Sequence, residues 1–421
     1  MVTNRKNRDM SQQTMDKTPS LAYIVSQYPM LSMIFIIREV VQLRARGFHI
    51  DVASINAADR GMEGLTRDEA NESALTYYVK PDGIKGALKA HFNTLTENTA
   101  GYFRGLAMIF RLGGTDLRDI FYNLMYFTEA LMVGVWMGQK GQRHLHAHLG
   151  AQSATVALYV KKIFGYGFSI TVHGPDEFYD APGQYLTQKV EAADFICCIS
   201  NFARSQLMKL SSYEHWHKLE VARLGVDPEI FAPRPFESSP EVFEIICVGR
   251  LSSAKGQHIL VDAIDRLIRE QRQVRLRIVG DGPDRRSLEQ HVTALKLNDH
   301  ILFEGAVNQD RIRDLYSRAH AFSMPSFAEG IPVVLMESMA MEIPCVTTRI
   351  TGIPELIRDG IDGILVAPSS TEELAEALAR LMDDPELRRT LGENGRKRVV
   401  EHYNLAPNVE KLGDIFQRHL G

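Results

Sequence analysis

The chain has 421 residues, of which 45% are hydrophobic and 24% are charged, so it is long enough for two or three globular domains with large cores. Its formal net charge of -4 provides no concentrated excess of Lys and Arg, which excludes a general affinity for nucleic acid backbones. No nucleic acid partner is therefore expected.

The first twenty residues are polar and lack the apolar segment of a signal peptide, so we expect a flexible tail over residues 1–20 and a cytoplasmic protein. The four cysteines, Cys197, Cys198, Cys247 and Cys345, lie in apolar runs without metal-ligand spacing. We expect these thiols to be free and buried.

The first half of the chain, residues 21–232, predicts a Rossmann-like domain. Short β-rich runs bounded by turn residues alternate with amphipathic helical stretches, which is typical of a parallel sheet covered by helices. The strand candidates are LAYIV (21–25), FHIDVAS (48–54), HLHAH (144–148), FSITV (168–172), DFICCI (194–199) and KLEVARL (218–224).

The part of this half between Lys80 and Lys162 is basic and partly apolar. It has ten Lys or Arg against five Asp or Glu, and it contains the run DIFYNLMYFTEALMVGVWMG (119–138). Such a surface could rest on an anionic membrane face; the alternative is that these helices pack on their own domain. Glu129 interrupts the apolar run, so we expect no helix that spans a membrane.

Histidines gather on two of the predicted strands. His144, His146 and His148 lie on one face of the strand 144–148, a geometry that could hold a metal ion. His173 follows the next strand, in TVHGPDEF (171–178), at the strand end where ligands bind in a doubly wound sheet. A lone His in such a loop is more often structural.

The second half predicts another Rossmann-like domain. A stretch rich in Pro and Ser, residues 232–240, indicates a linker over 233–240, followed by a domain over 241–404 and an amphipathic C-terminal helix over 405–421. The strand candidates of this half are EIICV (244–248), RLRIV (275–279), ILF (301–303), HAFSM (320–324), PCVTT (344–348) and GILVAP (363–368).

The loop after the first of these strands, GRLSSAKG (249–256), has a glycine turn and two cations, Arg250 and Lys255, and a helix begins near Gly256. A helix N-terminus beside two cations suits an anion such as a diphosphate. The alternative is that both are solvated surface charges.

The stretch SFAEGIPVVLMESMAMEIPCV (326–346) carries carboxylates inside an apolar segment. Pro332 fits the first turn of a helix that runs to about Met341, and Glu337 lies in the middle of that helix. A buried carboxylate needs a partner, which is either an Arg or backbone amide, or the hydroxyls of a polar ligand that Glu329 reaches from the preceding loop. Two carboxylates, two cations and glycine loops together describe a nucleotide sugar site.

Four segments carry a family resemblance. VGRLSSAKGQHILVDA, IVGDGP, FEGAV and the long stretch from PSFAEGIPVV to GILVAP resemble the second domain of retaining glycosyltransferases of family 4, with its Glu, seven residues, Glu motif. In the first half, TVHGPDEF, CISNFARSQL and RLGVD are similar to later landmarks of the family. SQYPMLSMIFIIREV resembles its exopolysaccharide branch, except that a common Ser-Glu-Thr-Phe run here reads Ser32, Met33, Ile34, Phe35.

The resemblance implies an α/β protein of the GT-B fold, with two Rossmann-like domains facing each other across a cleft. It implies that the last helix packs on the N-terminal domain, which faces the acceptor. The residues it implies for the donor site are Arg250 and Lys255 for the diphosphate, Glu337 for the ribose, Glu329 with the backbone of Gly330, Ile331, Pro332 and Val333 for the transferred sugar, Gly305 to Val307 for the base, and His173 near the sugar.

The implied activity is retaining transfer of a hexose-type sugar from a UDP- or GDP-sugar to a hydroxyl acceptor, such as a saccharide or lipid-linked saccharide in cell-surface polysaccharide synthesis. His173, Glu329, Arg250 and Lys255 are the expected catalytic residues. No cofactor is expected, and no metal either, since an Asp-x-Asp motif is lacking and the family commonly has His on this strand without a metal. Alternatives are a non-catalytic nucleotide-sugar-binding subunit, or an epimerase or phosphorylase of the same architecture.

Overall fold

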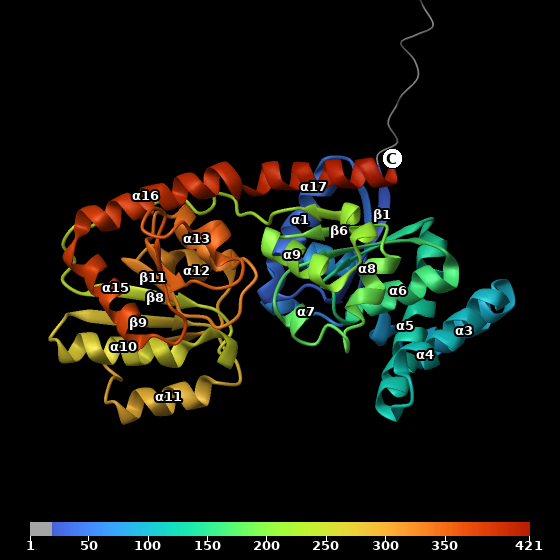
Figure 1. Ribbon diagram of the computed structural model, residues 1–421, viewed down its shortest axis with the longest axis horizontal. Coiled ribbons are helices and arrows are strands. Elements are labelled where there is room, and N and C mark those ends of the chain that lie inside the picture. The colour runs from blue at the N-terminus through green and yellow to red at the C-terminus, as the bar shows by residue number, and fades with distance from the viewer. Residues whose placement is uncertain (1–18) are drawn as a thin grey trace, which may run out of the picture.

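The structure is a computed structural model that describes residues 19–421 (Figure 1). The expected N-terminal tail lies almost wholly outside the described residues, and the first strand already begins at Ser20. Two parallel sheets with interleaved helices make up the chain, so the predicted α/β fold class with two Rossmann-like domains is confirmed.

The first sheet has seven parallel strands in the order β3-β2-β1-β4-β5-β6-β7. Every strand candidate of the first half forms a strand, and the two-residue edge strand β3 adds to them. The strands are β1 (Ser20–Gln27), β2 (His49–Asn56), β3 (Tyr77–Tyr78), β4 (His144–His148), β5 (Gly167–Val172), β6 (Phe195–Cys198) and β7 (Leu219–Val221).

Helices cover both faces of this sheet. The helices of the first domain are α1 (Ile34–Ala45), α2 (Arg67–Leu75), α3 (Val79–Glu97), α4 (Thr99–Gly113), α5 (Leu117–Lys140), α6 (Gln152–Phe164), α7 (Asp176–Tyr179), α8 (Leu186–Ala192) and α9 (Asn201–Leu210). Side chains alternate along β1, so Tyr23 faces the core under α1, whereas Ile24 faces the core formed with α5 and α6.

The second sheet has six parallel strands in the order β10-β9-β8-β11-β12-β13. All six strand candidates of this half are confirmed, as β8 (Phe243–Val248), β9 (Val274–Val279), β10 (Ile301–Gly305), β11 (Ala321–Met324), β12 (Cys345–Thr348) and β13 (Ile364–Val366). The helices are α10 (Gln257–Arg269), α11 (Arg285–Ala294), α12 (Gln309–Tyr316), α13 (Val333–Ala340), α14 (Ile353–Leu356), α15 (Thr371–Asp383) and α16 (Pro385–His402).

The C-terminal helix α17 (Leu405–Leu420) returns to the first domain. Figure 1 shows α16 and α17 in sequence along one side of both domains. The apolar face of α17 packs on α1 and on the sheet, where Phe416 contacts the rings of Tyr23, Phe48 and Phe195.

Two other expectations concern the thiols and the membrane. All four cysteines are buried and free, as predicted. Among the described helices, α5 is long and apolar enough to cross a membrane by length and composition, although Glu129 interrupts it. Half of its most apolar window is buried in the first domain, as in the core helix of a globular protein.

Candidate active site

The loops that follow β8 and β11 meet because these strands are parallel neighbours whose carboxyl ends lie at the same edge. The turn η4 (Ser253–Lys255) follows β8, and its Ala254 carbonyl accepts a 2.8 Å hydrogen bond from the Phe327 backbone in the loop after β11. Lys255 Nζ consequently donates to Glu329 Oε1 at 2.5 Å. A predicted cation and a predicted carboxylate of the donor site are thus brought together.

The backbone at Gly256 makes this approach possible. Gly256 has a φ of 64°, and a Cβ atom there would overlap the carbonyl oxygen of Pro325. Helix α10 begins directly after it, at Gln257, so a helix N-terminus opens beside Lys255 as predicted. Arg250 lies exposed in the same loop, and its side chain takes part in none of the ion pairs found among residues 19–421.

Glu337 lies on α13 and is 4% exposed, and burial raises the pKa of this carboxyl although Arg38 and Tyr316 counteract the rise. Arg38 Nη1 of α1 lies 3.5 Å from Glu337 Oε1, and Tyr316 hydroxyl donates to Oε2 at 3.3 Å. Within the protein, the partners of Glu337 are therefore an Arg and a Tyr, and the Arg is one of the partners that the sequence predicts. Because Arg38 belongs to the first domain, this ion pair joins the two domains.

The two domains also touch at glycines. A Cβ atom at Gly330 would overlap the His173 carbonyl oxygen, and a Cβ atom at Gly174 would lie 3.0 Å from the Gly330 nitrogen. Only residues without side chains allow the loop after β5 to approach the loop after β11 this closely. His173 therefore lies beside the segment Gly330 to Val333 that precedes and opens α13.

His173 lies at the end of a row of hydrogen-bonded, buried side chains. Its Nε2 lies 3.1 Å from His148 Nδ1, and His148 Nε2 lies 2.9 Å from Glu39 Oε1. Glu39 also accepts a 2.8 Å hydrogen bond from the Tyr23 hydroxyl. Burial, together with the neighbouring His148, holds the pKa of His173 well below its usual value, so its ring is neutral.

Two further buried side chains, Glu177 and Lys189, hold the loop that carries His173. Glu177 accepts hydrogen bonds from the backbone N–H groups of His173 at 2.6 Å and Gly174 at 2.8 Å, and from that of Gly150. Lys189 Nζ donates to the Gly150 carbonyl at 2.7 Å, and burial lowers the pKa of this ammonium to about 7. The loops after β4 and β5 are therefore held as one unit.

The histidines of β4 are occupied by hydrogen bonds. His144 Nε2 and His146 Nδ1 lie 2.7 Å and 2.8 Å from the Ser169 hydroxyl, and His146 Nε2 lies 2.9 Å from the Thr171 hydroxyl. Between residues 19 and 421, no group of three His, Cys, Asp or Glu side chains is arranged to hold a metal ion.

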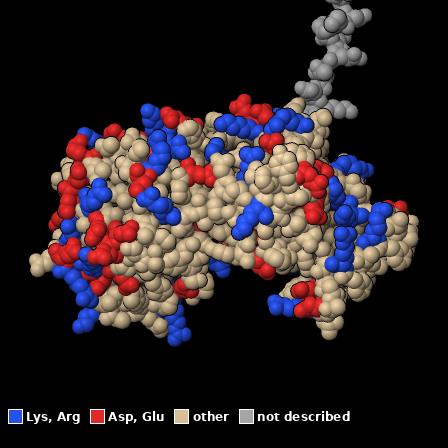
Figure 2. Space-filling view, viewed as in Figure 1, with Lys and Arg blue, Asp and Glu red and all other residues tan. Residues whose placement is uncertain are grey.

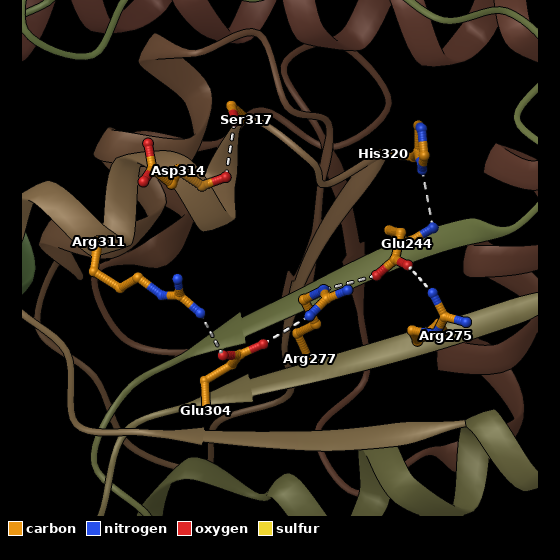
Figure 3. Close-up of polar contacts among 8 residues, drawn as sticks. All are labelled: Glu244, Arg275, Arg277, Glu304, Arg311, Asp314, Ser317 and His320. Atoms are coloured by element: carbon orange, nitrogen blue, oxygen red, sulfur yellow. Dashed lines mark hydrogen bonds and ion pairs between the residues drawn. The ribbon is translucent and has the colours of Figure 1, made fainter. Parts of the chain in front are cut away.

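The strand end that carries Gly305 and Val307 is held by an ionic network across the sheet (Figure 3). Glu304 on β10 accepts from Arg277 of β9 at 2.7 Å and from Arg311 of α12 at 3.3 Å, and Arg277 also donates to Glu244 of β8 at 3.0 Å. Burial pushes the pKa of Glu304 upward, but its hydrogen bonds to the two arginines outweigh this and bring the pKa below its usual value. The network fixes the segment predicted to read the base.

Several residues of this site could not be found from the sequence. Arg38 and Tyr316 contact Glu337 from 299 and 21 residues away, and no spacing rule joins them. The role of Glu177 could have been suspected from the sequence, because an acid four residues after His173 can accept from the backbone amides of the loop. Such a spacing is common in turns, so it is a weak indication.

The chain therefore consists of two Rossmann-like domains, and comparisons with known proteins show the same architecture. Residues 230–398 match the family model described as glycosyl transferases group 1. WcaL of Escherichia coli K12, assigned to colanic acid biosynthesis as a glycosyltransferase, is 25% identical over 409 residues, which cover 94% of this chain and 99% of WcaL.

Solved structures of the same fold cover nearly the whole chain. The sucrose-phosphate synthase of Thermosynechococcus elongatus has a TM-score of 0.74 at 19% identity, covering 95% of this chain and 98% of its own. Anabaena HepE, in complex with UDP and glucose, has a TM-score of 0.72 at 17% identity, covering 95% and 100%. Residues 230–398 belong to the group 1 glycosyltransferase family, and the chain as a whole has the GT-B fold, as its family 4 motifs indicated.

Proposed function

We propose that this protein transfers a hexose-type sugar from a nucleoside diphosphate sugar to a hydroxyl acceptor, with retention of the anomeric configuration. The observation that carries the proposal is the Lys255–Glu329 pair at the adjacent ends of β8 and β11, beside the start of α10. A cation and a helix N-terminus suit a diphosphate, and a carboxylate suits sugar hydroxyls. The complex of Anabaena HepE with UDP and glucose supports a donor of this class.

Each residue predicted to hold the donor has a role in this proposal. Lys255 and Arg250 bind the diphosphate, and Glu329 with the amides from Gly330 to Val333 binds the transferred sugar. Glu337 accepts hydrogen bonds from the ribose hydroxyls, and the Arg38 guanidinium compensates its buried charge. The backbone of Gly305 to Val307, held through Glu304, reads the base.

The chemistry follows from the charge that develops on the leaving diphosphate. Lys255, Arg250 and the N-terminus of α10 stabilise that charge, so no divalent metal is required. We assign a front-face route in which the acceptor hydroxyl attacks beside the leaving group, and the departing phosphate helps to remove its proton. In this route Glu329, whose Oε1 accepts hydrogen bonds from Lys255 and Ser326, positions the sugar and forms no covalent bond with it.

The acceptor in this proposal is a lipid-linked saccharide at the cytoplasmic face of a membrane. The support is the likeness to WcaL, which is assigned to the synthesis of a polysaccharide.

The proposal is tested by thermal shift with UDP-, GDP- and ADP-sugars, followed by nucleotide release with and without lipid-linked acceptors. One donor should stabilise the protein, and release should require an acceptor and continue in the presence of a chelator. Lys255→Ala should lose about 1.5–3 kcal/mol of donor binding, as expected for a charge-assisted hydrogen bond, while Lys397→Ala on the exposed side of α16 should not. Donor binding without release would favour the non-catalytic subunit, and a trapped glycosyl adduct on Glu329 would refute the front-face route.

A further inference from the structure

Three helices inserted between β3 and β4 expose an unusual amount of apolar surface. Of the 21 large hydrophobic side chains exposed within residues 19–421, eleven lie between Ile84 and Met125 on α3, α4 and α5. On α3 the exposed residues follow helical spacing at Ile84, Leu88, Phe92 and Leu95, which places them on one face. A stripe with this spacing ordinarily faces a core, but here it faces solvent.

The other two helices repeat this arrangement. On α4 the exposed Phe103 and Phe110 are seven residues apart and therefore share a face. On α5, Leu117 is 82% exposed, and Phe121 and Leu124 follow it at spacings of four and three. We call these exposed residues of α3, α4 and α5 the apolar face.

A cation directly follows five members of the apolar face. The pairs are Ile84–Lys85, Leu88–Lys89, Phe103–Arg104, Phe110–Arg111 and Leu117–Arg118. One residue along a helix is a turn of about 100°, so each cation lies at the edge of an apolar stripe. All five cations are exposed, and none of the ion pairs found among residues 19–421 includes them. Figure 2 shows several Lys and Arg side chains, with a few Asp and Glu among them, at the end of the first domain where Figure 1 places these helices.

We propose that the apolar face and its five flanking cations form a docking surface for an anionic lipid bilayer. Aromatic and aliphatic side chains with Lys and Arg at the edge of the same helical face are the pattern of helices that lie in a membrane interface. The long side chains of the cations can reach anionic headgroups while the apolar residues enter the acyl boundary. A protein interface is the weaker fit, because Lys is depleted there.

The structure favours docking and not spanning. The exposed residues of α5 lie in its N-terminal half, whereas its C-terminal half is buried in the core with α6, including Leu131, Val133 and Met137. Withdrawing that half into a bilayer would open the core of the first domain. The docked protein would act on acceptors carried in the same membrane, a consequence that rests on the proposed function.

The test uses the full chain and vesicle flotation. The protein should bind vesicles of equal parts phosphatidylglycerol and phosphatidylcholine and should not bind phosphatidylcholine alone, and added salt should weaken binding. The triple variant Phe92→Ser, Phe110→Ser, Phe121→Ser and the triple variant Lys85→Glu, Lys89→Glu, Arg111→Glu should each lower binding at least about tenfold. The matched control, Tyr213→Ser, removes an exposed aromatic ring that lies outside the apolar face.

Two results would overturn the docking surface. One is absence of binding to the anionic vesicles, or equal losses in the control. The other is a wild-type dimer that the Phe variant dissociates, because the apolar face would then join two copies of the chain. The thermal shift caused by the donor is measured on the same samples. If the proposed function is wrong but the docking surface is right, the protein will bind vesicles and show no thermal shift with any donor.

Discussion

The hydrogen-bond chain at His173 connects it through His148 to Glu39, which also accepts from the Tyr23 hydroxyl. In the neutral tautomer of His148 that donates from Nε2 to Glu39, Nδ1 of His148 accepts from His173 Nε2. Nδ1 of His173 is then a hydrogen-bond acceptor. Phe35, which lies in the first turn of α1 and is the last residue of the unusual run Ser32 to Phe35, packs on the His173 ring with centroids 5.1 Å apart.

This arrangement predicts a positioning role for His148. His148→Phe keeps an aromatic ring but removes the acceptor for His173, so the turnover rate should fall on the order of tenfold to a hundredfold while donor affinity stays unchanged. His144→Phe, at the other end of β4, is the control, because that ring stacks on Phe195 away from His173. Steady-state kinetics with donor titrations separate the two effects, and equal losses in both variants would refute the role.

The sequence identified the charged residues of the site but not the residues that contact them. Lys255 and Glu329 could be predicted because loops after strands bind ligands and because the motif is dense in charge. Glu39 and His148 are 109 residues apart, and such pairs are created by the order of strands in the sheet, which no local pattern encodes.

Helix α5 carries an acidic side chain in its buried part. Glu129 is 7% exposed, and burial raises the pKa of this carboxyl to about 7, although Lys80 at 3.9 Å opposes the rise. The folded state therefore holds the proton more tightly than the unfolded chain does.

Glu129 thus contributes stability that is fully present below its ordinary pKa of 4.5 and is lost as pH rises to about 7. The loss should be about 3 kcal/mol, from 1.36 kcal/mol per pKa unit. Glu129→Gln should flatten the pH dependence of the unfolding temperature between these limits. Glu97→Gln, at an exposed position at the end of α3, should leave it as in the wild type. A variant that keeps the wild-type pH dependence would exclude burial of this charge as its cause.

The sheets were the most predictable elements. Every strand candidate proved correct because apolar runs bounded by turns are strong signals, whereas the missed strand Tyr77–Tyr78 has two residues and no periodicity to detect. The sequence showed that the segment after this strand is basic and apolar, but not which of its apolar residues are exposed. That depends on how α3 and α4 pack on α5.

For the whole molecule, the chain crosses between the domains twice. The linker after β7 leads out of the first domain and α17 leads back into it, while Arg38–Glu337 and Gly330–His173 join the two loops that face each other. Glu355 of α14 adds a third contact, since its carboxylate accepts from the backbone N–H groups of Asn201 and Phe202 at the start of α9.

A substitution at Gly330 should hold the two domains apart. Gly330→Ala would place a methyl group against the His173 carbonyl, so the two loops must separate. The radius of gyration in small-angle scattering should increase, and the transfer rate should fall at least about tenfold, while binding of the nucleoside diphosphate alone changes little. Gly138→Ala in α5 is the control. An unchanged radius with an unchanged rate would remove this contact from the account.

The central claim is that a nucleoside diphosphate sugar is held between the domains by Glu337, Glu329 and Lys255. Calorimetric titration of Glu337→Ala with the donor that stabilises the wild-type protein tests it most directly, with Glu342→Ala as the matched carboxylate variant beyond the end of α13. We expect Glu337→Ala to abolish donor binding and Glu342→Ala to retain it. Unchanged donor affinity in Glu337→Ala would show that Glu337 does not hold the donor.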